Sequence, residues 1–232
     1  MRTAAIVPAA GRGERLGPGG PKALRLLGGV PLLVHAVRAL VQARSVDVVV
    51  VAAPPGDVVA VRGLLDDYDL PKEVEVVAGG ETRQESVRLA LVSLSEDVDV
   101  VLVHDAARPL VPPELVDAVA QAVRAGAQAV VPALPLSDTV KQVDENGNVV
   151  TTLDRSTLRA AQTPQGFRRS ALERSYVAAD GAIATDDAGL AELAGVAVTT
   201  IRGSAEALKV THPLDLQFAE ALLARRRGDR AR

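Results

Sequence analysis

The sequence contains no cysteine and no tryptophan, and it has only two phenylalanines, two tyrosines and three histidines. Without cysteine, disulfides, thiolate metal sites and cysteine nucleophiles are excluded. With so few aromatic rings, the chain has little with which to stack nucleic-acid bases. A metal site built from histidines is not expected either.

The chain also lacks a strong charge of one sign and a long apolar run. Its formal net charge is −3, so no global basic field favours nucleic acid. No apolar stretch is long enough to span a bilayer, and the run at 3–9 is too short for the core of a secretory signal. We therefore expect a cytoplasmic protein that binds neither nucleic acid nor membranes. The arginine-rich end, 226–232, is interpreted as a disordered tail.

Short, valine-rich runs that alternate with helical patterns are what the sequence has in abundance. Strand-like runs cover 3–9, 46–54, 73–79, 98–105, 127–134 and 196–203, and helical patterns cover 31–43, 57–67, 81–94, 113–125, 168–179, 186–194 and 213–226. The near-continuous valine of 46–54 is typical of a strand buried on both faces, as in parallel sheets. The alternation predicts one α/β domain over 1–232, with a Rossmann-like, mostly parallel, twisted sheet covered by helices.

The alternation stops at 136–160, where two polar, β-prone runs flank Asn146-Gly147. This dipeptide between such runs is typical of a β-hairpin. An isolated two-stranded hairpin is marginal in water, so this one needs support. The pattern does not decide between a second subunit and the surface of the same domain.

A glycine-rich loop at 9–22 follows the first predicted strand. Glycines let backbone N–H groups approach an anion closely, and Arg15 and Lys22 add charge that suits a reacting phosphate. The loop is not a dinucleotide fingerprint, because Leu16 stands where the third glycine belongs. It is not a P-loop either, because Lys22 is followed by Ala23 rather than by Ser or Thr. Taken alone, the loop also fits a mobile, solvated segment.

Polar motifs follow several other predicted strands. They are GGETRQES (79–86), HDAARP (104–109), QTPQGF (162–167), TDDAG (185–189) and EALKVTHP (206–213). Ligands of open parallel sheets bind beyond the carboxyl ends of the strands. The clustering of these motifs there predicts a binding site.

Individual side chains of these motifs allow two interpretations each. Asp105 could bind Mg²⁺ or a substrate hydroxyl, and Arg108 could bind a phosphate bidentately, or the two could form a structural pair. Thr82 or Glu81 could cap the helix that follows, and Glu85 would complete a capping box if Thr82 is the cap. Arg83 either serves the site or pairs with Glu85 or Asp187.

Together the motifs resemble one family closely, 2-C-methyl-D-erythritol 4-phosphate cytidylyltransferase of the non-mevalonate isoprenoid pathway. The matching stretches run in family order: VPAAGRGERLG with PKAL, GGETRQESV, VLVHDAARP, DTVK, LDRSTLRAAQTPQGF, TDDA and KVTHPLDLQFAE. The first stretch occurs in many nucleotidyltransferases, whereas HDAARP followed by TPQ and KVT is much more specific. Ribitol-5-phosphate cytidylyltransferase shares most of these motifs.

The resemblance implies a nucleotidyltransferase domain that transfers CMP from CTP to 2-C-methyl-D-erythritol 4-phosphate. The acceptor phosphate would attack the α-phosphorus in line and pyrophosphate would leave. Because the nucleophile is already an anion, catalysis is positioning plus charge neutralisation. Mg²⁺ would bridge the phosphate oxygens of CTP, with Asp105 as a candidate protein ligand, and Glu206 either helps to bind the metal or is an ordinary surface acid.

The resemblance also implies a role for each matched residue. The catalytic residues would be Arg15, Lys22, Arg155 and Lys209. The CTP pocket would be formed by Ala9, Ala10, Gly11, Gly79, Gly80, Glu81 and Ser86. The acceptor would be held by Asp105, Arg108, Thr139, Arg155, Thr163 and Lys209. In this family the 136–160 arm crosses to a partner subunit, so a homodimer with shared sites is implied.

Two positions depart from the family pattern. Ala207-Leu208 stands where the family often has Asn-Ile, and Glu81 stands where Asp is common. Other functions also stay open: transfer to ribitol 5-phosphate or a sugar 1-phosphate, a nicotinamide-dependent oxidoreductase, which Leu16 disfavours, and a non-catalytic nucleotide sensor.

Overall fold

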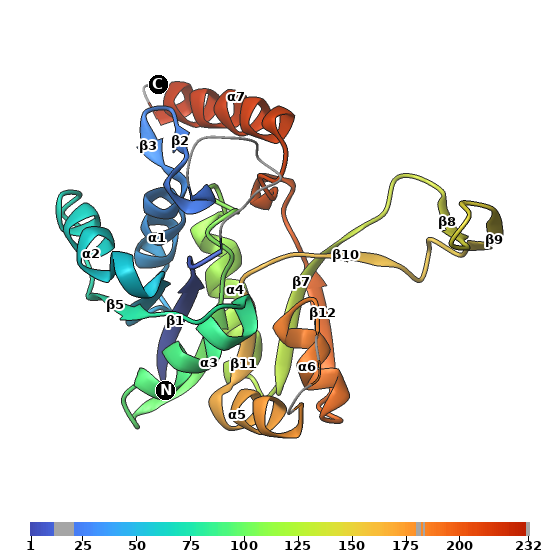
Figure 1. Cartoon of the computed structure of the whole chain (residues 1–232), viewed down its shortest axis with the longest axis horizontal. Coiled ribbons are helices and arrows are strands. Elements are labelled where there is room, and N and C mark those ends of the chain that lie inside the picture. Colours follow the sequence, from blue (N-terminus) through green and yellow to red (C-terminus); the bar gives the residue numbers. More distant parts are fainter. Residues whose placement is uncertain (12–20, 180–181, 183, 231–232) are drawn as a thin grey trace.

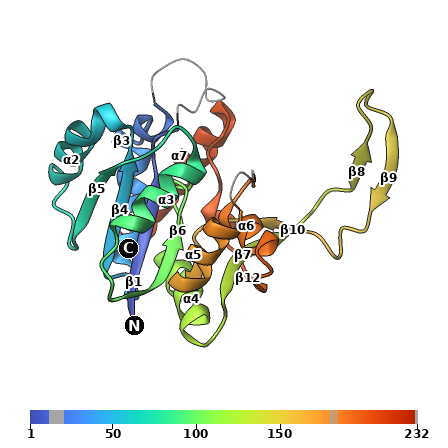
Figure 2. The ribbon, with the colours of Figure 1, turned by 60° about the horizontal axis from the view of Figure 1, so that its bottom comes forward.

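The centre of the molecule is a twisted sheet in which β1 (Arg2–Pro8) lies between β4 (Val48–Ala53) and β6 (Val98–Val103) (Figures 1 and 2). The computed structural model describes residues 1–11, 21–179, 182 and 184–230. β5 (Val74–Ala78) lies beyond β4, and these four strands are parallel. Every residue of β4 is buried, as the valine run predicted.

The other half of the sheet is mixed. The antiparallel strand β11 (Gln165–Arg168) lies between β6 and β7 (Ala129–Pro135). β10 (Arg159–Ala161) pairs antiparallel with β7, and β12 (Val198–Arg202) pairs parallel with it. The predicted fold class, a mostly parallel α/β sheet, is confirmed, although β10 and β11 were not among the predicted strands.

Helices cover both faces of the sheet, each through a buried apolar stripe. On one face lie α1 (Leu32–Gln42), α2 (Val58–Asp66) and α4 (Pro113–Arg124). On the other lie α3 (Arg83–Ser93), α5 (Arg169–Ala178) and α6 (Asp187–Leu193). None of the described helices is long and apolar enough to cross a lipid bilayer.

A last helix, α7 (Pro213–Arg230), lies outside both layers, against the short hairpin of β2 (Leu26–Leu27) and β3 (Val30–Pro31) (Figure 1). The prediction of a disordered tail is wrong as far as Arg230, because the helix continues to that residue. Arg226 holds it in place: its Nε donates to Glu206 at 3.0 Å and its Nη2 donates to the carbonyl of Leu110 at 2.7 Å.

The hairpin at 136–160 extends far from the body (Figures 1 and 2). Its strands β8 (Val140–Val143) and β9 (Val149–Leu153) pair with each other and, among the described strands, with no other. A five-residue loop joins the two strands. Asp144 Oδ1 stabilises this loop by accepting from the N–H groups of Asn146 and Asn148 at 3.0 and 2.8 Å. All of β9 is exposed.

Candidate active site

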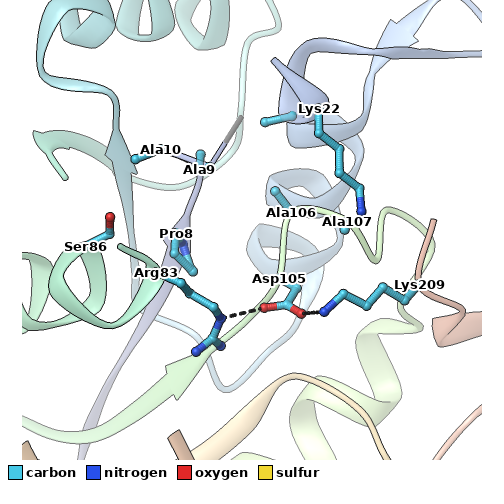
Figure 3. Close-up of a pocket in the computed structure, with 12 residues that line it drawn as sticks. Pro8, Ala9, Ala10, Lys22, Arg83, Ser86, Asp105, Ala106, Ala107 and Lys209 are labelled. Carbon is cyan, nitrogen blue, oxygen red and sulfur yellow. Dashed lines mark hydrogen bonds and ion pairs between the residues drawn. The ribbon is translucent and has the colours of Figure 1, made fainter. Parts of the chain in front are cut away.

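A pocket of about 220 Å³ opens beyond the carboxyl ends of β1 and β6 (Figure 3). This is where the parallel sheet predicts a ligand site. Its walls come from the loop after β1, the short 3-10 helix η2 (Lys22–Leu24), the start of α3, the loop after β6 and the segment before α7. The residues that line it are Pro8, Ala9, Ala10, Gly11, Lys22, Ala23, Arg83, Ser86, Asp105, Ala106, Ala107 and Lys209.

The residues predicted from the first loop meet those predicted from three later motifs in this pocket. They are Ala9, Ala10, Gly11, Lys22, Ser86, Asp105 and Lys209. The predicted catalytic residue Arg15 lies outside the described residues. Arg83 was left open by the sequence, and its side chain lines the pocket as well.

The glycine turn at Gly79 packs directly against the loop after β1. Its N–H donates to the carbonyl of Ala53 at 2.7 Å. A Cβ atom at this position would lie 2.8 Å from Ser86 Oγ and 3.1 Å from the Cβ of Ala10. Only glycine permits such an approach, so three residues predicted for the cytidine pocket do lie together.

Ser86 shapes this turn from within α3. Its buried hydroxyl accepts from the N–H of Gly80 at 3.1 Å and donates to the carbonyl of Thr82 at 2.8 Å. Of the two candidate caps, Thr82 is the one that caps α3, accepting from the N–H of Glu85 at 3.0 Å. The backbone N–H of Glu81 donates to Glu85 Oε2 at 2.8 Å, and the Glu81 side chain is exposed.

Asp105 is the charged centre of the site. Its Oδ1 accepts from Arg83 Nε at 3.1 Å and its Oδ2 accepts from Lys209 Nζ at 2.8 Å (Figure 3). Burial opposes ionisation of the carboxyl group, but the two cations outweigh it and hold the pKa of Asp105 well below its ordinary value. The group is therefore a carboxylate whose two oxygens each have a cationic partner.

Arg83 joins Asp105 to a second buried carboxylate. Its Nη1 donates to Oδ2 of Asp187, on α6, at 2.7 Å. Of the partners the sequence left open, the structure thus selects Asp187 rather than Glu85. The TDDA motif indicated Asp187 as a candidate residue of the site. It could not show that Asp187 pairs with Arg83, because the two residues are 104 positions apart in the sequence.

Lys22 enters the pocket from η2, and its side chain extends toward Ala107 (Figure 3). Among the described residues, the charged side chains of the lining are thus three cations, Lys22, Arg83 and Lys209, and one carboxylate, Asp105. Such an excess of positive charge beside a backbone turn suits a phosphorylated ligand.

Arg108 faces away from this pocket. Its Nη1 donates to the carbonyl of Ala207 at 2.7 Å and its Nη2 to that of Ala161 at 3.2 Å. Burial lowers the pKa of Arg108. In this arrangement the guanidinium braces the main chain, so a bidentate phosphate contact stays a prediction that the geometry does not favour. The charges of Arg108 and Asp105 attract each other, although no hydrogen bond or ion pair joins the two side chains among the described contacts.

Thr163 lies behind Asp105. Its Oγ1 accepts from the N–H of Asp105 at 3.0 Å and contacts His104 Nδ1 at 3.1 Å, while His104 Nε2 lies 3.1 Å from the carbonyl of Arg108. Because that carbonyl can only accept, Nε2 carries the proton of a neutral imidazole and Thr163 donates to Nδ1. Burial lowers the pKa of His104 to about 4, which fits the neutral form. The Thr163 hydroxyl therefore has partners in both its roles, and its predicted contact to the acceptor stays untested.

Thr139 and Arg155 belong to the arm, not to the pocket of the same chain. Both side chains are exposed, and neither lines the pocket. Arg155 Nη1 donates to the carbonyl of Ser137, also in the arm. One chain thus brings together only part of the predicted acceptor site.

Comparison with known families gives a match over almost the whole chain. A family model described as IspD, 2-C-methyl-D-erythritol 4-phosphate cytidylyltransferase, matches residues 3–225. A protein of that name from Streptomyces coelicolor is 58% identical over 97% of this chain and 86% of its own length. Another from Frankia casuarinae is 62% identical over 97% of this chain and 82% of its own length.

Solved structures agree with these relatives. The crystal structure of 2-C-methyl-D-erythritol 4-phosphate cytidylyltransferase from Thermus thermophilus is 37% identical, with a TM-score of 0.77 over 96% of this chain and 98% of that chain. The 4-diphosphocytidyl-2C-methyl-D-erythritol synthase from Anaerococcus prevotii is 28% identical, with a TM-score of 0.83 over the same shares. The comparisons therefore agree with the resemblance found in the motifs.

Proposed function

The chain belongs to the 2-C-methyl-D-erythritol 4-phosphate cytidylyltransferase family, and we propose that the pocket beyond β1 and β6 is where it transfers CMP from CTP to 2-C-methyl-D-erythritol 4-phosphate. The observation that carries this placement is the meeting of Lys22, Lys209 and Asp105 beside the Gly79 turn. The product is 4-(cytidine 5'-diphospho)-2-C-methyl-D-erythritol.

The reaction needs charge stabilisation more than proton transfer. An oxygen of the acceptor phosphate forms a bond to the α-phosphorus of CTP, and the bond from that phosphorus to the pyrophosphate oxygen breaks with its electron pair. No proton must move, because nucleophile and leaving group are both anions. None of the described lining residues is a histidine, which suits a site that works by positioning and fixed cations.

Two lysines of the pocket and one arginine of the preceding loop have a proposed role in binding phosphate. Lys22, entering opposite Asp105, is placed to neutralise charge on the α-phosphate and the leaving pyrophosphate (Figure 3). Arg15, on the preceding loop, is proposed for the same role on the strength of the motif alone. Lys209 is proposed to bind the acceptor phosphate, for which it must share or leave its ion pair with Asp105.

The cytidine end of CTP is proposed to lie against the Gly79 turn. Ala10, Gly79 and Ser86 pack together there, and Ala10 and Ser86 line the pocket with small side chains that leave room for a base beside the turn. Gly80 and the exposed Glu81 continue the same turn, so Glu81 is placed at its rim rather than inside it.

Magnesium is proposed to enter with the nucleotide, as magnesium–CTP. Among the described residues no group of three or more histidines, aspartates and glutamates could hold a metal ion. Asp105 fits poorly as a lone protein ligand, because both of its oxygens already accept from cations. We therefore assign no step to a metal held by the protein. The expected result is that Asp105→Asn leaves the Mg²⁺ dependence of the residual activity unchanged.

The arm supports the proposal of a homodimer. Its valines Val143, Val149 and Val150 are 53–63% exposed, which is unfavourable for a hairpin that stands alone in water. Thr139 and Arg155 lie on the same arm, away from the pocket of their own chain. A second copy that received this arm would gain both residues for its acceptor site.

Mixed dimers test this sharing. Lys22→Ala disables the pocket of one chain, and Arg155→Ala disables the arm of the other. After subunit exchange, half of the dimers contain both variants, and each of these has one intact composite site. The expected activity is about a quarter of the wild-type value. No recovery after verified exchange would overturn the shared site.

The activity itself is tested by measuring pyrophosphate release from CTP with different acceptors. Methylerythritol phosphate is expected to give product, and Lys22→Ala to keep the fold but lose about 100- to 1000-fold in turnover. Arg2→Ala, an exposed cation at the opposite end of β1, is the control. If only ribitol 5-phosphate gave product, the proposed acceptor would be wrong. CTP binding without turnover of any acceptor would favour a nucleotide sensor, and near-normal turnover of Lys22→Ala would remove Lys22 from the catalytic residues. A cytoplasmic location stays a prediction.

A further inference from the structure

A buried carboxylate stands behind the pocket with both oxygens engaged. Oδ1 of Asp187 accepts from the hydroxyl of Tyr176, on α5, at 2.6 Å, and Oδ2 accepts from Arg83 Nη1 at 2.7 Å. The Asp187 side chain is 1% exposed, so water does not compete for these contacts. Burial and the carboxylate raise the pKa of Tyr176, so its hydroxyl stays protonated and keeps donating.

The backbone around Asp187 is fixed independently by its neighbour. Oδ1 of Asp186 caps α6, accepting from the N–H of Gly189 at 2.9 Å, and Oδ2 accepts from Gln165 Nε2 at 2.6 Å. Gln165 Oε1 in turn accepts from the N–H of Ala188 at 3.0 Å. The two aspartates of the TDDA motif therefore have different roles, since one anchors the helix and the other is aimed at Arg83.

The guanidinium of Arg83 transmits this position to the pocket. It is planar, so holding Nη1 on Asp187 also fixes the direction of Nε, which donates to Asp105 Oδ1 at 3.1 Å. An arginine held only at Asp105 would keep several rotamers, and phosphates in the pocket would attract it. Asp187 removes that freedom.

The fixed position of Arg83 becomes important when Lys209 breaks its ion pair with Asp105 to bind a phosphate. Lys209 is 42% exposed and pairs with Asp105 Oδ2 at 2.8 Å, so it is the partner free to turn toward an acceptor phosphate. Arg83 then has to keep Asp105 ionised and oriented. Oδ2, released by Lys209, would point into the pocket as an acceptor for a substrate hydroxyl.

We propose that Asp187, held by Tyr176, is a positioning residue for acceptor binding: it fixes Arg83 on Oδ1 of Asp105, so that Lys209 can move to the acceptor phosphate while Oδ2 receives an acceptor hydroxyl. The identity of the acceptor rests on the function proposed above. Asp187 itself touches no substrate in this arrangement, and its effect passes entirely through Arg83.

Steady-state kinetics of Asp187→Asn and Tyr176→Phe test the proposal. Asp187→Asn is expected to raise the KM for the acceptor about tenfold with the KM for CTP unchanged, and Tyr176→Phe about threefold. In an Arg83→Gln background, Asp187→Asn is expected to add less than about twofold, because its route is already lost. Multiplying effects in the double variant, or equal increases in both KM values, would overturn the proposal.

Matched controls separate this inference from loss of fold and from failure of the proposed function. Tyr68→Phe and Asp97→Asn change the other tyrosine and an exposed aspartate paired with Arg2, and both are expected to behave as wild type. If Asp187→Asn does not fold, Tyr176→Phe carries the same cycle with Arg83→Gln. Wild-type enzyme inactive with every acceptor would refute the proposed function. Active wild type with an unaffected Asp187→Asn would refute only this inference.

Discussion

The pocket and the arm satisfy their polar groups in opposite ways. Around Asp105, the partners come from distant parts of the chain: Arg83, Thr163 and Lys209 are 22, 58 and 104 positions away. On the arm, Arg155 bonds to Ser137 in the same hairpin. The pocket is therefore fixed by the fold of one chain, whereas this contact fixes only the shape of the arm, whose valines stay exposed.

Replacing Asp105 by asparagine should have the largest effect, because Asp105 joins the distant segments that form the pocket. The neutral amide leaves Arg83 and Lys209 without their shared anion, so Lys209 loses its ion pair and the pocket loses the carboxylate proposed to receive the acceptor hydroxyl. Turnover is expected to fall about 1000-fold, or about 4 kcal/mol in activation free energy. Steady-state assays measure it, and circular dichroism shows whether the fold survives. Asp97→Asn, at an exposed ion pair, should change neither, and a fall below tenfold would mean that Asp105 is not central.

The second-largest effect expected is a loss of stability in acid, caused by the buried His104. Its pKa is lowered from 6.5 in the unfolded chain to about 4, so below pH 6.5 the unfolded state takes up a proton that the folded state refuses. The resulting stability is present above pH 6.5 and is lost as the pH falls toward 4. The loss approaches about 1.4 kcal/mol per pH unit and about 3 kcal/mol in total.

Urea unfolding at a series of pH values measures this effect. His104→Asn should lower stability at neutral pH but flatten the slope between pH 6.5 and 4 by about one proton. His35, whose pKa is also lowered by burial, contributes in the same direction and stays in both proteins. An unchanged slope in the variant would mean that His104 titrates normally.

Charging the arm should separate assembly from folding. Val150→Asp places a carboxylate on the exposed valine surface, and sedimentation is expected to show monomers in place of dimers. Activity should fall about 100-fold if the partner's Arg155 completes the site. The free energy of unfolding of the monomeric body should change by less than about 0.5 kcal/mol. A variant that stays dimeric and active would remove the arm from the site.

The smallest expected effect comes from substituting one glycine of the pocket and one of the arm and comparing the KM for CTP of the two variants. Gly79→Ala pushes a Cβ against Ser86 and Ala10, so the KM for CTP is expected to rise about tenfold. Gly147→Ala in the arm loop meets nothing within 4 Å, although its φ of +83° strains an alanine. It should leave the KM for CTP unchanged. Equal KM values for the two variants would show that the Gly79 turn does not form the nucleotide site.

Local pattern was enough for most of the fold. Valine runs marked the buried parallel strands, and Thr82 marked the start of α3, because both signals lie within a few residues of the element they define. β10 and β11 were not predicted, because their short segments, QGFR among them, become strands only by pairing with β6 and β7. The arginine-rich end became helix for a similar reason, since Arg226 finds Glu206 only after folding.

The site followed the same rule. The motifs at strand ends predicted which residues meet in the pocket, because a parallel sheet gathers its strand ends at one edge. They did not predict which side of each motif faces the ligand. Arg108 turned to main-chain carbonyls and Thr163 to His104, since those choices depend on segments 53 to 99 positions away.

The brace formed by Arg108 has a consequence for how the sequence can vary. Its guanidinium holds carbonyl oxygens of Ala161 and Ala207, and every amino acid carries that oxygen. An asparagine, as the family often has at position 207, and the alanine found here both supply this carbonyl oxygen. The exchange therefore keeps the bond that holds the segment leading to Lys209. Position 108 has no such freedom. Of these three positions, the exposed Ala161 should tolerate substitution best. The buried Ala207 is limited by the space around its side chain, and Arg108 by the two bonds that it donates.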